Sequence, residues 1–189
     1  MFSLYLTGAP ATGKSSVARL VAERSSGMYL SYGELLTKQL AGRVRDQTEL
    51  RTQSARAIST VDVIEADKYV QQVITETSGT TNLVVDSHAL TSEDYGFRAV
   101  PFSAQQWQSL PFTRIVCLWA PSSVIRARVE SDAGGRPLLT DEEFDMHAQL
   151  QSALALAYAH TAGLPIAFIN SDSPLDSVVD AVLAFVESD

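Results

Sequence analysis

The stretch FSLYLTGAPATGKSS, residues 2–16, decides how this chain folds. Its first six residues are mostly apolar or aromatic, as in a short buried strand, and they end at Gly8. After the glycine-rich turn, apolar residues from Val17 to Ala22 recur with helical spacing. The stretch therefore predicts a strand, a tight loop and a helix in immediate succession.

The loop matches the pattern G-x-x-x-x-G-K-[ST] in full, between a predicted strand and a predicted helix. In such a loop the glycines let backbone N–H groups point at phosphates, and the helix N-terminus adds positive potential. Lys14 neutralises β- and γ-phosphate oxygens, and Ser15 ligates Mg²⁺. We expect ATP to contact the following loop residues: Gly8, Ala9, Pro10, Ala11, Thr12, Gly13, Lys14, Ser15 and Ser16.

A phosphate-binding loop needs a carboxylate that orients Mg²⁺ or its waters, at the carboxyl end of a parallel strand. Asp86 meets this requirement because it ends the apolar run Leu83-Val84-Val85. His88 follows at the same edge, where it either orients water or a phosphate or caps the loop. We predict Ser15 and Asp86 as metal ligands and Lys14, Asp86 and His88 as catalytic residues.

Arginines follow the fourth predicted strand, where a mobile lid that excludes water belongs. Arg126 and Arg128 lie two apart on a predicted helix and face different ways. At most one of them therefore points inward together with Arg136, which follows two glycines. Residues 131–139 are predicted to form the lid. We assign Arg128 to catalysis, and Arg126 and Arg136 to substrate binding.

Three further arginines are predicted to bind substrate. Arg45 and Arg51 begin the segment between the second strand and a long helix, which suits a clamp on an acceptor phosphate. Residues 32–60 are therefore the predicted acceptor-binding segment. Arg98 lies in the loop after Asp86. Arg45 is the first choice among the three, and a solvated surface role is the alternative for each.

The rest of the chain alternates strands and helices. Apolar strands are expected at residues 28–31, 83–85, 114–120 and 166–169, with helices between them and at the end. Strands this apolar imply a parallel sheet covered on both faces. We predict one α/β domain over residues 1–189, a P-loop NTPase three-layer sandwich with a five-stranded parallel sheet and a short lid. Residues 91–112 are expected to be largely irregular, with a short helix at 104–110.

Composition disfavours several classes of protein. The formal net charge of −8 disfavours a generic grip on the nucleic-acid backbone. The single cysteine, Cys117, lies in an apolar run, so we expect no disulfide within the chain and a reduced, cytoplasmic location. The first residues lack a basic leader, and no apolar window of about 18 residues exists, so we expect no membrane span. The predicted partner is a small-molecule acceptor, and an oligomer is possible.

These motifs resemble the archaeal-type adenylate kinases and, more distantly, the nuclear adenylate kinases that carry an Asp-x-His motif. The resemblance runs from Leu4 to about Asn170. Besides the loop, it rests on Ser31-Tyr32-Gly33-Glu34, Asp86-Ser87-His88-Ala89 and Leu118-Trp119-Ala120-Pro121.

The resemblance implies ATP:AMP phosphoryl transfer with Mg²⁺. Its nucleotide and metal site corresponds to Lys14, Ser15, Asp86 and His88. Its gripping arginines correspond to Arg45, Arg51, Arg126 and Arg128. The chain departs from the family at the lid, where residues 130–135 are acidic or small instead of basic. It also departs after His88, where residues 95–101 read YGFRAVP in place of Gly-Tyr-Leu-x-Gly-Leu-Pro.

Two alternatives to a nucleoside-monophosphate kinase stay open. One is a kinase for another small metabolite, although a shikimate-kinase-like site wants acidic residues after the second strand, where only Glu34 stands. The other is a slow ATPase switch or assembly factor that binds a protein or RNA partner.

Overall fold

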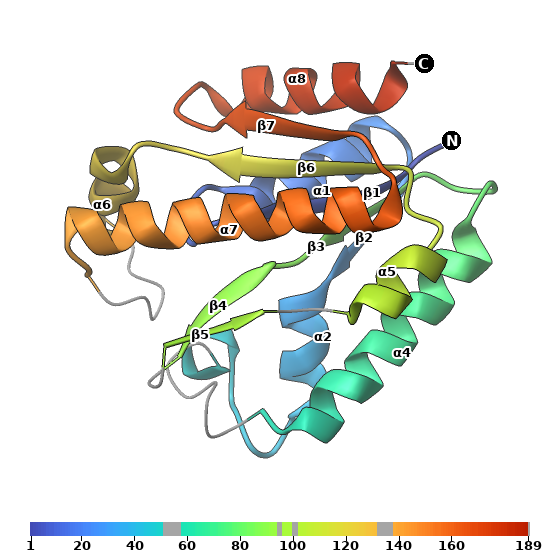
Figure 1. The fold of residues 1–189 in the computed structure, drawn as a ribbon, viewed down its shortest axis with the longest axis horizontal. Helices are drawn as coiled ribbons and strands as arrows, with labels where there is room; N and C mark the ends of the chain where they lie inside the picture. Colours follow the sequence, from blue (N-terminus) through green and yellow to red (C-terminus); the bar gives the residue numbers. More distant parts are fainter. Residues whose placement is uncertain (51–57, 94–95, 100–101, 132–137, 189) are drawn as a thin grey trace.

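The computed structural model describes residues 1–50, 58–93, 96–99, 102–131 and 138–188. It confirms the predicted sandwich, in which a five-stranded parallel sheet lies between two layers of helices (Figure 1). The strand order is β2-β3-β1-β6-β7. The strands are β1 (Ser3–Gly8), β2 (Met28–Ser31), β3 (Leu83–Asp86), β6 (Arg114–Trp119) and β7 (Ile166–Asn170).

The central strand, β1, is buried along its whole length between β3 and β6. Its register pairs Leu6 with Asp86 and Gly8 with Leu118, so the carboxyl ends of three strands meet at one edge of the sheet. From β1 the chain continues to one side of the sheet, to β2 and β3, and from β3 it crosses to the other side. The crevice between β1 and β3 is therefore a topological switch point, where open α/β sheets bind ligands.

One face of the sheet is covered by α1 (Lys14–Arg24) and α8 (Leu175–Glu187). The apolar residues of these helices form a cluster with Leu4 and Leu6 of β1. Burying this cluster holds the first helix, and with it the phosphate loop, against the sheet.

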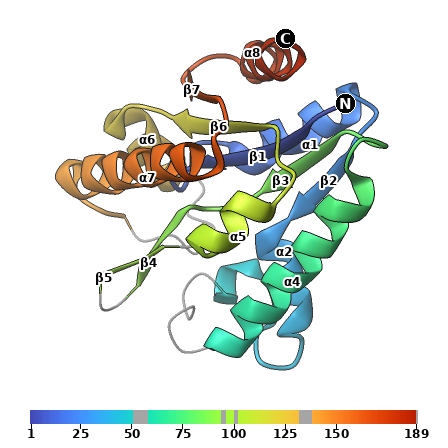
Figure 2. The ribbon, with the colours of Figure 1, turned by 45° about the vertical axis from the view of Figure 1, so that its right-hand side comes forward.

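The other face is covered by α2 (Tyr32–Gln39), α4 (Thr60–Thr77), α5 (Ala104–Ser109) and α7 (Asp141–Ala162) (Figures 1 and 2). Aromatic rings gather in this layer around the buried Trp107, which stacks on Tyr158 and meets Tyr5 edge to face, at centroid distances of 4.6 and 4.9 Å. A smaller apolar cluster joins α6 (Ser122–Ser131) to α7.

Helix boundaries follow the sequence signals. Ser59 forms a capping box and precedes α4, and residues 47–50 are helical before it. Thr140 forms a capping box with Glu143 and precedes α7, and Gly163 ends that helix in the left-handed conformation at φ 65°.

One expectation is wrong. Residues 91–112 are not largely irregular, because their first part belongs to an antiparallel hairpin of β4 (Leu90–Glu93) and β5 (Gly96–Ala99), in which Thr91 pairs with Arg98. The hairpin extends from the carboxyl end of the sheet, beyond β3 (Figure 2). The short helix expected at residues 104–110 is present as α5.

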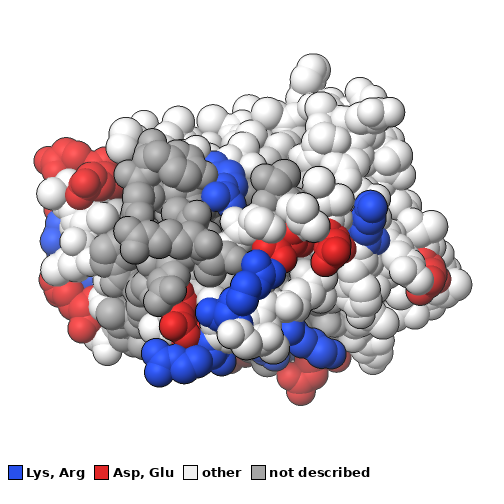
Figure 3. Space-filling model, turned by 90° about the horizontal axis from the view of Figure 1, so that it is seen from below, with Lys and Arg blue, Asp and Glu red and all other residues white. Residues whose placement is uncertain are grey.

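Two predicted segments are described only in part. Residues 132–137 of the lid, with Arg136, and residues 51–57 of the acceptor segment, with Arg51, lie outside the described residues. Among the helices that the structure describes, none is both long and apolar enough to cross a membrane. On the face seen from below, basic and acidic side chains are interspersed (Figure 3).

Candidate active site

The phosphate loop has the backbone that its glycines predict. A Cβ atom added to Gly8 would lie 2.6 Å from the carbonyl oxygen of Leu118, so only glycine fits beside β6. Gly13 precedes α1 at φ 79°, and Ala11 also has a positive φ of 62°. Left-handed residues within a short loop are typical of concave nests of N–H groups that bind anions. Here the nest stands at a helix N-terminus, where an anion is further stabilised.

A cavity of about 220 Å³ lies over this loop. It is lined by loop residues and by Arg19, Glu34, Gln47 and His88. Of the predicted nucleotide contacts, Ala9 and Ala11 to Ser16 line this cavity, and Pro10 lines the adjoining one.

The centre of the site is an ion pair between Lys14 Nζ and Asp86 Oδ1, 2.8 Å apart, with both side chains at most 9% exposed. The hydroxyl of Tyr29, from β2, donates to the other carboxylate oxygen, Oδ2, at 3.2 Å. Burial alone would raise the pKa of the Asp86 carboxyl, but the Lys14 charge and hydrogen bonds from Lys14 and Ser15 hold it below its usual range. Asp86 is therefore ionised at neutral pH.

Ser15 and Asp86 fit the protein's share of a Mg²⁺ site. Both side chains line the larger cavity described below, and Ser15 also lines the cavity over the loop. Mg²⁺ in nucleotide sites keeps waters and takes phosphate oxygens, so it needs only one or two protein ligands. Among the described residues, no group of three or more His, Cys, Asp or Glu side chains could hold a metal ion.

His88 is held as a neutral imidazole. Burial, and next the Lys14 charge, lower the pKa of its ring well below the usual value. Its Nδ1 lies 3.3 Å from the carbonyl oxygen of Gly8, so Nδ1 carries the proton in this contact and Nε2 is left as an acceptor. The ring is therefore uncharged and offers Nε2 as a hydrogen-bond acceptor.

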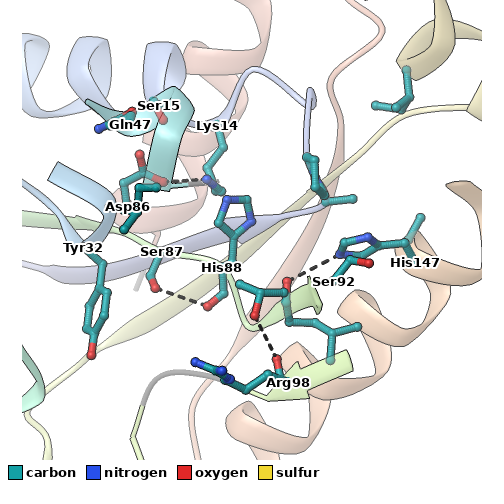
Figure 4. A pocket seen from close by; sticks show the side chains of 18 of the residues that line it. Lys14, Ser15, Tyr32, Gln47, Asp86, Ser87, His88, Ser92, Arg98 and His147 are labelled. Carbon is teal, nitrogen blue, oxygen red and sulfur yellow. Dashed lines mark hydrogen bonds and ion pairs between the residues drawn. The ribbon is translucent and has the colours of Figure 1, made fainter. Parts of the chain in front are cut away.

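A second, larger cavity of about 250 Å³ adjoins the first. It runs from α2 and α4 on one side to α6 and α7 on the other, beneath the β4–β5 hairpin. Figure 4 shows His88 between the Lys14–Asp86 pair and the hairpin residues Ser92 and Arg98. The two cavities share Ala9, Lys14, Ser15, Gln47 and His88, so a ligand in one meets a ligand in the other at these residues.

The predicted arginines lie in different places. Arg98 is half-buried and lines the larger cavity. Arg128 donates to the carbonyl oxygens of Ala11, at 3.2 Å, and Ser171, at 2.6 Å, so it ties the phosphate loop to the turn after β7. Its guanidinium lies beside the loop.

The other two described arginines form ion pairs with their neighbours. Arg126 donates twice to Asp141 Oδ1, at 2.9 and 2.6 Å, and thereby links α6 to α7. Arg45 pairs with Glu49 at 3.0 Å, and its side chain is 87% exposed. Neither residue lines the larger cavity.

The sequence interpretation missed the side chains of α7 that hold the site in place. Gln151 is fully buried and donates to Thr7 Oγ1, at 2.8 Å, while its oxygen accepts from the Leu90 N–H at 3.0 Å. His147 is also buried, 3.4 Å from the carbonyl oxygen of Leu90. Both lie on the buried stripe of α7 with Phe144 and Ala155. Polar residues on an otherwise apolar stripe were the available signal.

Comparison with known proteins agrees with this architecture. The family described as AAA domain matches residues 7–145. An adenylate kinase of Pyrococcus furiosus is 25% identical over 98% of this chain and 95% of its own, and one of Methanothermobacter thermautotrophicus is 24% identical over 96% and 97%. The resemblance seen in the motifs is thus confirmed across the whole chain.

Two solved structures share the fold of this chain. A shikimate kinase from Acinetobacter baumannii in complex with shikimate superposes with a TM-score of 0.64 at 15% identity, covering 98% of this chain and 93% of that one. A gluconokinase from Sinorhizobium meliloti gives 0.55 at 15% identity, covering 98% and 91%. The chain therefore belongs to the AAA domain family, and its fold is that of the P-loop kinases.

Proposed function

We propose that this protein is a phosphotransferase that moves the γ-phosphoryl group of ATP to a nucleoside monophosphate, with AMP favoured. The observation that supports this proposal best is the junction of the two cavities at Lys14, Ser15 and His88. A donor phosphate over the loop and an acceptor in the larger cavity would meet there. A site that only hydrolysed ATP would not need the second cavity.

The walls of the acceptor side suit a nucleobase. Between α2 and α4 the larger cavity is lined by Tyr32, Leu36, Leu50, Ile58 and Val63, which are aromatic or aliphatic. The Tyr32 hydroxyl donates to the buried Asp67 of α4, which fixes the ring in this wall. A flat base gains from such contacts, whereas a polyol acceptor would need several hydrogen-bond partners in place of these apolar side chains.

The chemistry proposed for the site is positioning and charge stabilisation. The acceptor oxygen forms a bond to the γ-phosphorus while the bond from phosphorus to the β,γ-bridging oxygen breaks, and ADP leaves. Lys14 would stabilise the negative charge on the γ-phosphoryl group during transfer. Ser15 and Asp86 would hold Mg²⁺, which neutralises charge on the phosphates. Arg98 would face the acceptor. His88 Nε2 would accept a hydrogen bond from a hydroxyl or N–H group of the acceptor or from water. The loop backbone, kept in shape by Arg128, would bind the donor.

A panel of acceptors tests the proposal. Purified protein receives Mg-ATP with AMP, CMP, UMP, GMP, adenosine, gluconate, shikimate or no acceptor, and phosphorus NMR identifies the product. We expect AMP to give ADP fastest. Lys14→Ala should reduce this transfer on the order of 100-fold or more, since it removes the main cation at the phosphates. Equal ATP consumption with and without every acceptor would instead indicate the ATPase switch, and transfer only to a sugar acid would indicate the metabolite kinase.

A further inference from the structure

Asp86 is fixed by two different donors on its two oxygens. Lys14 Nζ lies 2.8 Å from Oδ1, and the Tyr29 hydroxyl donates to Oδ2 at 3.2 Å. Tyr29 comes from the neighbouring strand, where it pairs with Val84, two residues before Asp86. Because side chains alternate along a strand, Tyr29, Val84 and Asp86 lie on the same face of the sheet, the face covered by α1.

Tyr29 is itself held in place on its outer side. The Arg19 guanidinium lies over its ring, 4.5 Å from the centroid, and Arg19 also forms an ion pair with Glu34. A phenol hydroxyl carries its proton at neutral pH, so Tyr29 donates to the Asp86 carboxylate.

Nucleotide binding at the loop affects the two donors of Asp86 differently. Lys14 is the cation that phosphates recruit, so binding draws it away from Asp86. The carboxylate would then be free to rotate if Lys14 were its only anchor. Tyr29 lines neither cavity and so has no competing partner there among the described residues. It can keep its hydrogen bond throughout the reaction.

We propose that Tyr29 is a positioning residue that holds the Asp86 carboxylate toward Ser15 after Lys14 has moved to the nucleotide phosphates. The inference rests on the proposed function, because it takes Asp86 as a ligand of the nucleotide-bound metal or of its waters. A tyrosine that served only the core would contribute through its ring. A positioning tyrosine acts through its hydroxyl.

The test is Tyr29→Phe, which keeps the ring and its packing and removes only the hydroxyl. Tyr69→Phe, at an exposed position of α4, is the matched control. Binding of Mn²⁺ to the protein with ADP is measured by electron paramagnetic resonance and calorimetry, and transfer to the best acceptor by steady-state kinetics. We expect Tyr29→Phe to weaken Mn²⁺ binding about 10-fold, as for a lost hydrogen bond to a charged group. It should lower kcat with little change in the acceptor KM, and the control should match the parent protein.

A double-variant cycle shows whether Tyr29 acts through Asp86. In an Asp86→Asn background, adding Tyr29→Phe should change Mn²⁺ binding less than twofold, because the carboxylate is already gone. An equal loss in both backgrounds would overturn the inference, as would Tyr29→Phe protein that binds Mn²⁺ and turns over like the parent.

Failure of the proposed function gives a different result. Parent protein that neither binds Mn-ADP nor transfers phosphate would overturn both claims. Parent protein that does both, with an unchanged Tyr29→Phe variant, overturns only the role of Tyr29.

Discussion

Charged side chains in this protein differ in what they can do because they differ in their surroundings. Arg98 and Arg45 are both predicted acceptor contacts, and their surroundings cannot be compared from the sequence. In the structure Arg98 lines the larger cavity, whereas Arg45 is 87% exposed and pairs with Glu49. An exposed ion pair of neighbours on a chain contributes little and is screened by salt. The cavity contact is therefore the better candidate for an acceptor clamp.

This difference predicts unequal effects of two matched variants. Arg98→Ala should raise the acceptor KM about 10-fold or more, since a charged hydrogen bond in the cavity acts on the bound acceptor in ground and transition states alike. Arg45→Ala should change KM less than about twofold. Steady-state kinetics with varied AMP at saturating Mg-ATP measures both. A larger effect from Arg45 would indicate that the acceptor phosphate binds beside Arg45 and not in the larger cavity.

At the scale of elements, α7 bonds the chain segments around the site and also lines the larger cavity. Its Gln151 bonds both the end of β1, at Thr7, and the start of β4, at Leu90. These are the chain segments on either side of the crevice between β1 and β3. One amide therefore links the strand that leads into the loop to the segment that follows Asp86 and His88.

Gln151→Ala should lower the free energy of unfolding by about 2–4 kcal/mol, because it leaves the Thr7 hydroxyl and the Leu90 N–H buried without their partner. Gln149→Ala, at an exposed position of the same helix, should have almost no effect. Urea denaturation followed by circular dichroism measures both. We also expect turnover to fall in Gln151→Ala protein that is still folded, and unchanged stability would show that water replaces the amide.

Local signals explain which elements could be predicted. The caps at Ser59 and Thr140 and the stop at Gly163 act within a few residues, and the structure has helix ends at all three. The β4–β5 hairpin was missed because its four-residue strands carry little alternation of their own. It is fixed instead by Gln151 and His147, about 60 residues away in the chain.

The candidate site likewise contains residues that local motifs predict and residues whose contacts depend on the tertiary structure. Lys14, Ser15 and Asp86 could be predicted because a loop motif and an apolar run ending in Asp place them at one sheet edge. Tyr29 could not, since its contact with Asp86 depends on the pairing of β2 with β3. Helical spacing could show that Arg126 and Arg128 face different ways, but it could not predict their partners Asp141 and Ser171, which come from later elements.

At the scale of the whole molecule, the fold places two of its three histidines at the site, where His147 is buried and His88 is half-buried. Burial lowers the pKa of both the His88 and the His147 rings, and for His147 the hydrogen bond to Leu90 opposes the shift only in part. In the unfolded chain both would titrate near the ordinary value of about 6.5. The unfolded state therefore binds more protons below that pH. Stability is fully present above it and is lost as the pH falls.

The free energy of unfolding should consequently decrease between pH 7.5 and pH 5.5. His147→Gln, whose amide can still donate to the Leu90 carbonyl, should make this decrease smaller. His160→Gln, at an exposed position near the end of α7, is the control and should leave the slope unchanged. Urea titrations at four pH values measure the slope. A slope that stays the same in His147→Gln would mean that His147 does not contribute to the acid sensitivity.

The ion pair of Lys14 with Asp86 also has a consequence for the binding of single ions. An inorganic anion that binds by itself must take Lys14 away, and it leaves a carboxylate that is 3% exposed without its counter-charge. A divalent cation that binds Asp86 by itself leaves the Lys14 ammonium without its counter-charge. Only a ligand that delivers a polyanion and a dication together satisfies both partners at once. We therefore expect the site to bind free orthophosphate or free metal weakly and to bind the complex of the two more tightly.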